Sequence, residues 1–408
     1  LADDTIVIFA SDQQSDGKWT CYEGARVPLA IRWPGHIEAG RVDHALVSSV
    51  DIAPTILDLC GVDRGDGITP AIDGRSIALL TRGETMPERP VLIEMGYGRA
   101  VIANGHKYIA IRHPPEVANR ADETGETPDF LGRFGAKRDA EQMRRRWPAY
   151  GRPDQLYDLR NDPLEQRDLA GDPVRADTLA AMRAVLREAL DPLPHAFGEF
   201  KEAAATSSGE RKRAAVNAKP DSPTQVSAHP NVLFIIADDQ GYSDFGFTGN
   251  PLVKTPALDR LAAESAVFKN FVVAAACSPS RSAFYTGRDH LLTGVWGVPP
   301  RANLRRDEAL MPAFFQAAGY ETLYVGKGDM ARLPDSTPWD RGWDDAWTVG
   351  GYQHRDPKMP HRHGTEQFTG WTADIMTDLI LKFLRDEPRG KPWFVTAAFI
   401  IPHLPFQC

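Results

Sequence analysis

The feature that most constrains the fold is an alternation of apolar runs with helix-like segments. Residues 5–10 and 231–237 are almost unbroken apolar runs, as expected for strands buried on both faces of a sheet. Further strands are predicted at residues 27–32, 322–325 and 392–400. Helices are predicted at residues 51–60, 257–265, 311–318 and 372–384. This alternation predicts an α/β fold in which helices sandwich a mostly parallel central sheet.

Residues 86–200 have a different character. Short strands joined by Gly-containing turns are predicted at residues 90–95, 99–103 and 107–111. Residues 177–190 follow with the pattern of an amphipathic helix. Together these segments predict a smaller antiparallel-sheet α+β subdomain.

The domain boundaries follow from these patterns. Residues 201–228 consist mainly of Ala, Ser, Lys and Pro, which is typical of a linker or tail. We expect residues 229–408 to combine with residues 1–85 in one α/β domain, and residues 86–200 to form the subdomain. At 408 residues the chain is long enough for both.

Charge and cysteine content exclude some classes of function. A net charge of −8 argues against nucleic acid and anionic membranes as partners. No run approaches the roughly 20 apolar residues of a membrane span, and the chain opens on a strand without a signal peptide. The four cysteines lack metal-site spacing, so neither a zinc site nor a disulfide framework is expected.

The sequence C-S-P-S-R-S at residues 277–282, followed by T-G-R at 286–288, is the most informative motif. If Pro279 lies in the first turn of a helix, Cys277 lies at its amino-terminal end, where free N–H groups favour anions. Arg281 is four residues further on and returns to the same face. A lone cysteine in such a place is usually a buried structural residue. The complete motif favours a functional one.

Acidic residues follow both of the long apolar runs. Asp238 and Asp239 come directly after residues 231–237, and Asp12 and Gln13 follow residues 5–10. Adjacent carboxylates repel each other unless a cation lies between them, and a hard divalent ion prefers oxygen ligands. Either site alone could be a turn or a helix cap. Together they predict one metal site at the carboxyl edge of the sheet.

The 277–288 motif resembles the C-x-P-S-R and T-G-R signature of the type I, formylglycine-dependent sulfatases of the alkaline phosphatase superfamily. The resemblance implies that a maturation enzyme oxidises Cys277 to formylglycine, whose hydrate is the nucleophile. It also implies a calcium ion, or magnesium, held by Asp238, Asp239, Asp12 and Gln13. Gln13 is a departure, since the family has Asn or His there.

Three further segments resemble family motifs that bind the sulfate group. They are Gly17-Lys18 with the Y-E-G at residues 22–24, Gly326-Lys327, and the P-H-L-P at residues 402–405. The resemblance implies that Lys18, Lys327 and His403 bind the substrate and take part in catalysis beside Cys277 and Arg281. Asp329 stands where the family has a histidine, so that role does not carry over. Lone lysines and histidines are mostly solvated surface residues, so these assignments depend on the resemblance.

The order of the motifs is unusual. Residues 229–408 resemble the half that comes first in the family, whereas residues 1–200 resemble the later half. One interpretation is a circular permutation with residues 201–228 joining the old ends, and the other is a discontinuous or cleaved protein written in an unusual order. The helical turns that the family places between the His403 and Asp12 segments are absent. Because His403 and Asp12 would serve one sulfate, we expect the two chain ends to lie together at the mouth of the site.

The expected function is hydrolysis of a sulfate ester, releasing inorganic sulfate and an alcohol. Two alternatives stay open: a phosphonate monoester or phosphodiester hydrolase of the same superfamily, and a non-catalytic protein that binds sulfated glycans. The expected partners are a sulfated small molecule or sugar and a formylglycine-generating maturation enzyme. The resemblance favours a periplasmic or secreted location.

Overall fold

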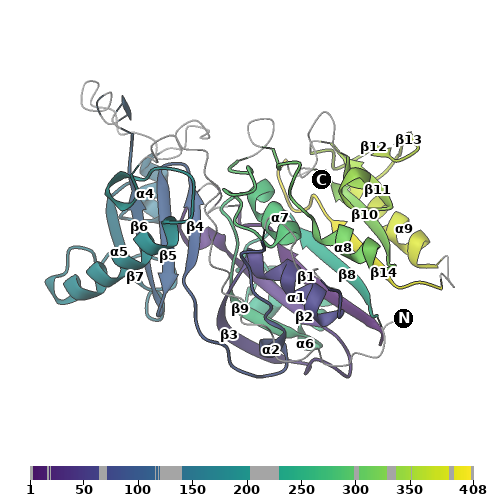
Figure 1. The fold of residues 1–408 in the computed structure, drawn as a ribbon, viewed down its shortest axis with the longest axis horizontal. Coiled ribbons are helices and arrows are strands. Elements are labelled where there is room, and N and C mark those ends of the chain that lie inside the picture. Colours follow the sequence, from purple (N-terminus) through teal and green to yellow (C-terminus); the bar gives the residue numbers. More distant parts are fainter. Residues whose placement is uncertain are drawn as a thin grey trace. The chain divides into compact units, whose positions relative to one another are not determined.

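The computed structural model divides the chain into two compact units (Figure 1). The first comprises Leu1–Ser15, Arg26–Met86 and Asn217–Cys408, and the second comprises Asp16–Ala25 and Pro87–Val216. The structure describes residues 3–15, 18, 20–63, 71–114, 116–117, 119, 140–202, 229–297, 303–328, 337–350, 352–385 and 390–405. Over these residues, no helix is long and apolar enough to cross a membrane.

A large mixed sheet forms the core of the first unit. Its strands are β1 (Thr5–Ser11), β2 (Arg26–Arg32), β3 (Arg41–Ser48), β8 (Asn231–Ala237), β9 (Ala266–Val272), β10 (Glu321–Lys327), β11 (Asp345–Val349), β12 (Lys358–His361), β13 (Gly364–Gln367) and β14 (Trp393–Ala398). They lie in the order β13-β12-β11-β10-β14-β8-β1-β2-β9-β3. Only β2 and β12 run against the direction of the other described strands. The prediction of a mostly parallel sheet is confirmed.

Helices cover both faces of this sheet. On one face, α1 (Ile52–Leu59), α7 (Cys277–Thr286) and α8 (Met311–Ala317) pack against one another and against the inward side chains of β1 and β8. On the other face, α6 (Pro256–Ala263) packs near β2 and α9 (Thr372–Arg385) packs on β10 and β14. The short helix α2 (Ala78–Thr81) contacts α1.

The pairing of β1 with β8 joins the two halves of the chain in one sheet. The strands are parallel and in register, from Thr5 opposite Asn231 to Ser11 opposite Ala237. The residues that follow these strands therefore emerge side by side at the same edge. This register places Asp12 next to Asp238.

The second unit contains a separate antiparallel sheet in the order β4-β5-β6-β7. Its strands are β4 (Val91–Met95), β5 (Gly98–Ala103), β6 (His106–Ile111) and β7 (Asp154–Asp158). Helix α5 (Ala176–Leu190) packs on β5 and β6 and buries Met182, Leu186 and Leu190 at intervals of four residues. A further helix, α4 (Ala140–Arg146), precedes β7. The predicted antiparallel subdomain is confirmed.

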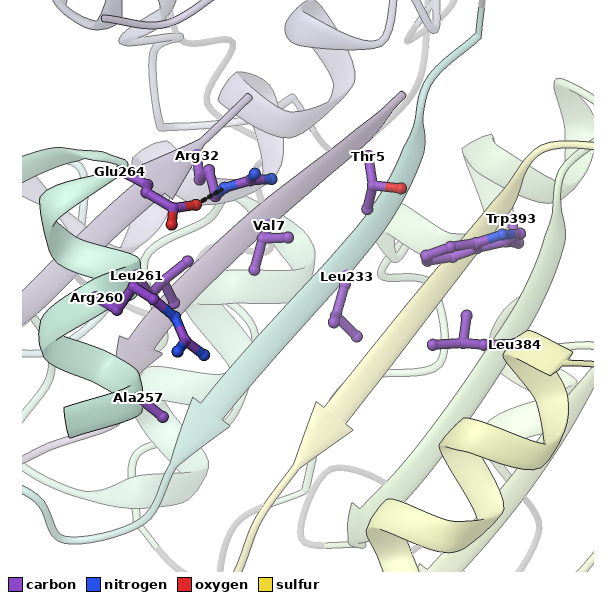
Figure 2. Close-up of a pocket in the computed structure, with 10 residues that line it drawn as sticks. All are labelled: Thr5, Val7, Arg32, Leu233, Ala257, Arg260, Leu261, Glu264, Leu384 and Trp393. Atoms are coloured by element: carbon purple, nitrogen blue, oxygen red, sulfur yellow. Dashed lines mark hydrogen bonds and ion pairs between the residues drawn. The ribbon is translucent and has the colours of Figure 1, made fainter. Parts of the chain in front are cut away.

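A groove of about 400 Å³ crosses the sheet face between α6 and α9 (Figure 2). Val7 and Leu233 form its floor, and Arg32 and Glu264 form an ion pair at 2.7 Å on one side. The other lining residues are Thr5, Ala257, Arg260, Leu261, Leu384 and Trp393. Because Thr5 is the first residue of β1, the groove lies at the amino-terminal end of the strands, away from Asp12 and Asp238.

The prediction that the two chain ends lie together is wrong for the described residues nearest to them. Asp4 precedes β1, whereas His403 follows β14, and both strands run parallel to β8. A seven-residue strand spans about 20 Å, so these residues lie at opposite edges of the sheet. The site requires Asp12, which comes after the strand, and not the start of the chain. The circular permutation itself stays a prediction.

Candidate functional site

Helix α7 presents Cys277 at its first turn. Ala276 caps the helix in extended conformation (φ −158°, ψ 156°), and the N–H of Ser280 donates to its carbonyl oxygen at 3.0 Å. Pro279 occupies the first turn, where a backbone N–H is not needed. All ten residues of the helix are buried. The predicted helix start is confirmed, and the amino-terminal end of a buried helix favours an anion.

Three carboxylates meet at the carboxyl edge of β1 and β8. The N–H of Asp12 donates to the carbonyl oxygen of Ala237, and the N–H of Asp239 donates to Oδ1 of Asp12, both at 3.2 Å. Asp239 has a φ of +63°, in the left-handed region that few non-glycine residues adopt. Asp12 and Asp238 are fully buried and Asp239 is 5% exposed. Such a concentration of buried acid requires compensating positive charge.

Two buried basic side chains supply part of that charge. Nε of Arg281 lies 2.8 Å from Oδ2 of Asp12, and its Nη2 lies 3.8 Å from Oδ2 of Asp238. Nζ of Lys327, the last residue of β10, lies 2.5 Å from the same Asp238 oxygen. Burial alone would lower the pKa of Arg281, but the charges of Asp12 and Asp238 hold that pKa well above its ordinary value. Arg281 therefore stays charged at any physiological pH.

His403 and Gln13 both contact Asp239. Nε2 of His403 lies 3.2 Å from Oδ2 of Asp239, and its Nδ1 lies 2.5 Å from the carbonyl oxygen of Leu404. The side-chain amide of Gln13 is fully buried and donates to Oδ1 of Asp239. The longer arm of Gln13 thus reaches the carboxylate cluster.

The arrangement fits a divalent metal ion. Ligand atoms of Asp12, Asp238 and Cys277 lie within 4.8 Å of one another, and so do those of Asp238, Asp239 and His403. Oδ1 of Asp238 and Oε1 of Gln13 are buried without a hydrogen-bond partner. Leaving a buried oxygen unsatisfied is costly, and oxygens are the ligands that calcium and magnesium prefer. These residues could hold such an ion.

Charge balance determines which ligand the site favours. Without a metal, three carboxylates face the positive charges of Arg281 and Lys327. A bound divalent cation would leave the cluster with an excess of positive charge, although the whole chain carries −8. A site of this kind attracts a small anion such as a sulfate ester.

Lys18 belongs to a different compact unit from the other predicted site residues. It belongs to the second unit, whereas the other eight belong to the first. Its segment is anchored by Tyr22, whose ring stacks on Trp147 at 4.7 Å and whose hydroxyl donates to Oε1 of Gln155 at 2.8 Å. Lys18 itself is buried. Asp329, where the family has a histidine, falls outside the described residues.

Tyr352 contacts the site and was not predicted. Its ring stacks on the imidazole of His403 at a centroid distance of 3.9 Å, and Nζ of Lys327 lies 5.2 Å from its centroid. Only its position in the sequence could have indicated this role. Tyr352 follows β11, just as Asp238 follows β8 and Lys327 ends β10.

Two family models match the chain. The model described as Sulfatase matches residues 230–408, and the model described as N-sulphoglucosamine sulphohydrolase, C-terminal, matches residues 14–94. The match to the C-terminal model therefore comes first in this chain. Six of the nine candidate residues lie in the match at residues 230–408 and Lys18 lies in the match at residues 14–94. Asp12 and Gln13 lie just before the start of the latter.

Curated relatives match about half of the chain. Arylsulfatase J of Mus musculus is 32% identical over 216 residues, which cover 48% of this chain and 36% of that protein. N-acetylgalactosamine-6-sulfatase of Homo sapiens is 36% identical over 209 residues, which cover 43% and 40%. The chain thus spans less than half the length of these relatives. The crystal structure of Ps i-CgsB is 24% identical over 44% of this chain and 46% of its own, with a TM-score of 0.39, too low to support an argument about function.

Proposed function

Because the chain belongs to the sulfatase family, we propose that it hydrolyses a sulfate ester to inorganic sulfate and an alcohol. The observation that supports this most is the position of Cys277. It begins a buried helix, and its sulfur lies within 4.8 Å of carboxylate oxygens of Asp12 and Asp238. The nucleophile and the metal site that we propose are therefore adjacent.

Binding of the sulfate group is proposed for the basic side chains of the cluster. Lys327 and His403 would pair with sulfate oxygens, and the N–H groups at the start of α7 favour the same anion. The family resemblance gives Lys18 the same role. Arg281 bridges Asp12 and Asp238 and so keeps both carboxylates in place. A calcium or magnesium ion bound by Asp12, Gln13, Asp238 and Asp239 would withdraw charge from the sulfate.

The nucleophile that we propose is formylglycine made from Cys277. When hydrated, this group offers one hydroxyl to attack sulfur and a second whose deprotonation expels sulfate without another attack on sulfur. The departing alkoxide needs a proton as the S–O bond breaks. His403 is one candidate donor, with Nδ1 at the carbonyl of Leu404 and Nε2 3.2 Å from Oδ2 of Asp239. Lys18 is the other candidate donor.

The substrate class that we propose is a sulfated sugar or another small sulfate ester. One relative is an N-acetylgalactosamine-6-sulfatase, and this supports a sugar. The family relationship also leads us to propose a secreted or periplasmic protein that meets a formylglycine-generating enzyme during maturation.

The test compares two aryl substrates and two variants. The full chain is produced together with a formylglycine-generating enzyme, and free sulfate is measured from an aryl sulfate beside aryl phosphodiester hydrolysis. We expect sulfate release that disappears in Cys277→Ala and persists in Cys60→Ala, whose cysteine is buried in the core away from the cluster. Mass spectrometry should find formylglycine at position 277.

Three outcomes would count against the proposal. Faster hydrolysis of the phosphodiester would favour the phosphoryl-transfer alternative. Binding of sulfated glycans without any release of sulfate would favour the non-catalytic alternative. Full turnover by protein whose residue 277 is unmodified cysteine would refute the formylglycine mechanism.

A further inference from the structure

The aromatic side chain of Tyr352 contacts both His403 and Lys327. It follows β11, which pairs with β10 so that Val349 lies opposite Lys327. Its ring is parallel to the His403 imidazole within 11°, at 3.9 Å between centroids. Nζ of Lys327 lies 5.2 Å from the same ring centroid, within the range of a cation–π interaction.

The stacking supplies a constraint on His403 that its hydrogen bonds do not. Nδ1 is held by the carbonyl of Leu404 and Nε2 faces Asp239. A parallel ring at van der Waals distance resists tilting of the imidazole, because tilting would separate the two stacked faces.

Tyr352 also constrains the position of the Lys327 amine. Its amine sits on a flexible four-carbon stem, and its 2.5 Å contact with Asp238 would draw it fully onto that carboxylate. The negative face of the Tyr352 ring offers a second attraction. The amine is therefore held between Asp238 and the ring.

Exposure places Tyr352 at the outside of the site. Tyr352 is 39% exposed, whereas Lys327 is 1% exposed and His403 is 9% exposed. The two basic groups are thus buried, and burial strengthens their attraction for an anion. We propose that Tyr352 is a positioning residue that fixes His403 and Lys327, and its effect on catalysis rests on the proposed function.

The kinetic test compares Tyr352→Phe with Tyr352→Leu. Phenylalanine keeps the stacked ring, so its kcat/KM should stay within about twofold of the parent. Leucine removes both the stacking and the cation–π interaction. We expect kcat/KM to fall roughly 5- to 50-fold, through a lower kcat and a higher KM. Trp371→Leu is the matched control, since Trp371 is also 39% exposed and its ring lies 5.6 Å from an arginine, Arg355.

A spectroscopic test does not depend on activity. The Cε1 proton of His403, identified by its loss in His403→Gln, experiences the ring current of Tyr352. We expect this signal to move downfield in Tyr352→Leu and to stay in place in Tyr352→Phe and Trp371→Leu. Circular dichroism confirms that the variants fold.

The two tests separate the inference from the proposed function. An unmoved His403 signal in Tyr352→Leu overturns the inference, whatever the kinetics. In an active enzyme, an unchanged kcat/KM in Tyr352→Leu overturns it too. A parent that releases no sulfate refutes the proposed function, and the His403 signal then decides the role of Tyr352 alone.

Discussion

The backbone N–H of Asp239 donates to Oδ1 of Asp12 at 3.2 Å, although 227 positions separate the two residues. The in-register pairing of β1 and β8 brings them together, because Ser11 lies opposite Ala237. The left-handed conformation of Asp239 then turns the chain at the strand end. The carboxylate of Asp239 can thus contact Gln13 and His403 while its amide binds Asp12.

Asp239→Asn should lose the metal and keep the fold. Asparagine adopts the left-handed region more readily than most residues, so the backbone turn survives. The amide carries no charge and is a weaker ligand for a divalent ion than a carboxylate, so the site loses one of its three negative charges. We expect calcium content, measured by mass spectrometry of the purified protein, to fall together with sulfate release, while the melting temperature of metal-free protein changes little.

The control for this substitution is Asp378→Asn, an exposed aspartate on α9. It removes the same charge from the chain without touching the cluster, so metal content should be unchanged. Calcium bound at the parental level in Asp239→Asn would contradict the assignment of Asp239 as a ligand.

Local pattern was sufficient to predict the strands that carry the acidic residues. The runs at 5–10 and 231–237 are continuous and apolar, and each ends in acidic residues, so their common edge follows from parallel strand geometry. The edge strand β3 was missed because exposed and buried residues mix along it without a clean alternation. Tyr352 was missed for another reason. Its only signal was its position after β11, since its partners His403 and Lys327 come from other parts of the sequence.

Gln155→Leu should destabilise the second unit more than Tyr22→Phe does. Oε1 of Gln155 accepts from the hydroxyls of both Tyr22 and Tyr157 at 2.8 Å, and all three residues are buried. Leucine leaves two buried hydroxyls without this acceptor, which costs roughly 2–5 kcal/mol, whereas Tyr22→Phe removes one hydrogen bond at about 1 kcal/mol.

Urea unfolding followed by circular dichroism measures both variants. Equal stability of the two variants would mean that Gln155 does not link the two tyrosines.

Glu165 should make the second unit less stable as the pH rises toward neutrality. Burial raises the pKa of this carboxyl to about 7, despite the nearby charge of Lys107 at 2.7 Å, and the charges of Glu23 and Asp162 add to the rise. Between its ordinary pKa of 4.5 and about 7, the folded state keeps a proton that the unfolded chain has released. The stability contribution therefore falls across this window, by about 3 kcal/mol, and levels off above it.

Glu165→Gln is the variant that isolates this effect, because glutamine does not titrate. The free energy of unfolding of the parent should decrease relative to that of Glu165→Gln from pH 4.5 to 7.5. If the free energy of unfolding of the parent instead increased with pH relative to that of Glu165→Gln, the ion pair with Lys107 would outweigh burial and lower the pKa of Glu165.

Arg281 should be replaceable for folding only when a metal takes over its charge. Its guanidinium bridges Asp12 and Asp238 in a fully buried position. Arg281→Met leaves these carboxylates without that partner, which costs about 3–5 kcal/mol in metal-free protein. A divalent ion between the same carboxylates would restore part of this loss, so calcium should raise the melting temperature of Arg281→Met more than that of the parent. Arg281→Lys keeps the charge but cannot span both carboxylates with a planar fork, so it should fold and lose most of its activity. Equal calcium-induced shifts in Arg281→Met and the parent, measured by differential scanning calorimetry, would show that Arg281 and the metal do not share these ligands.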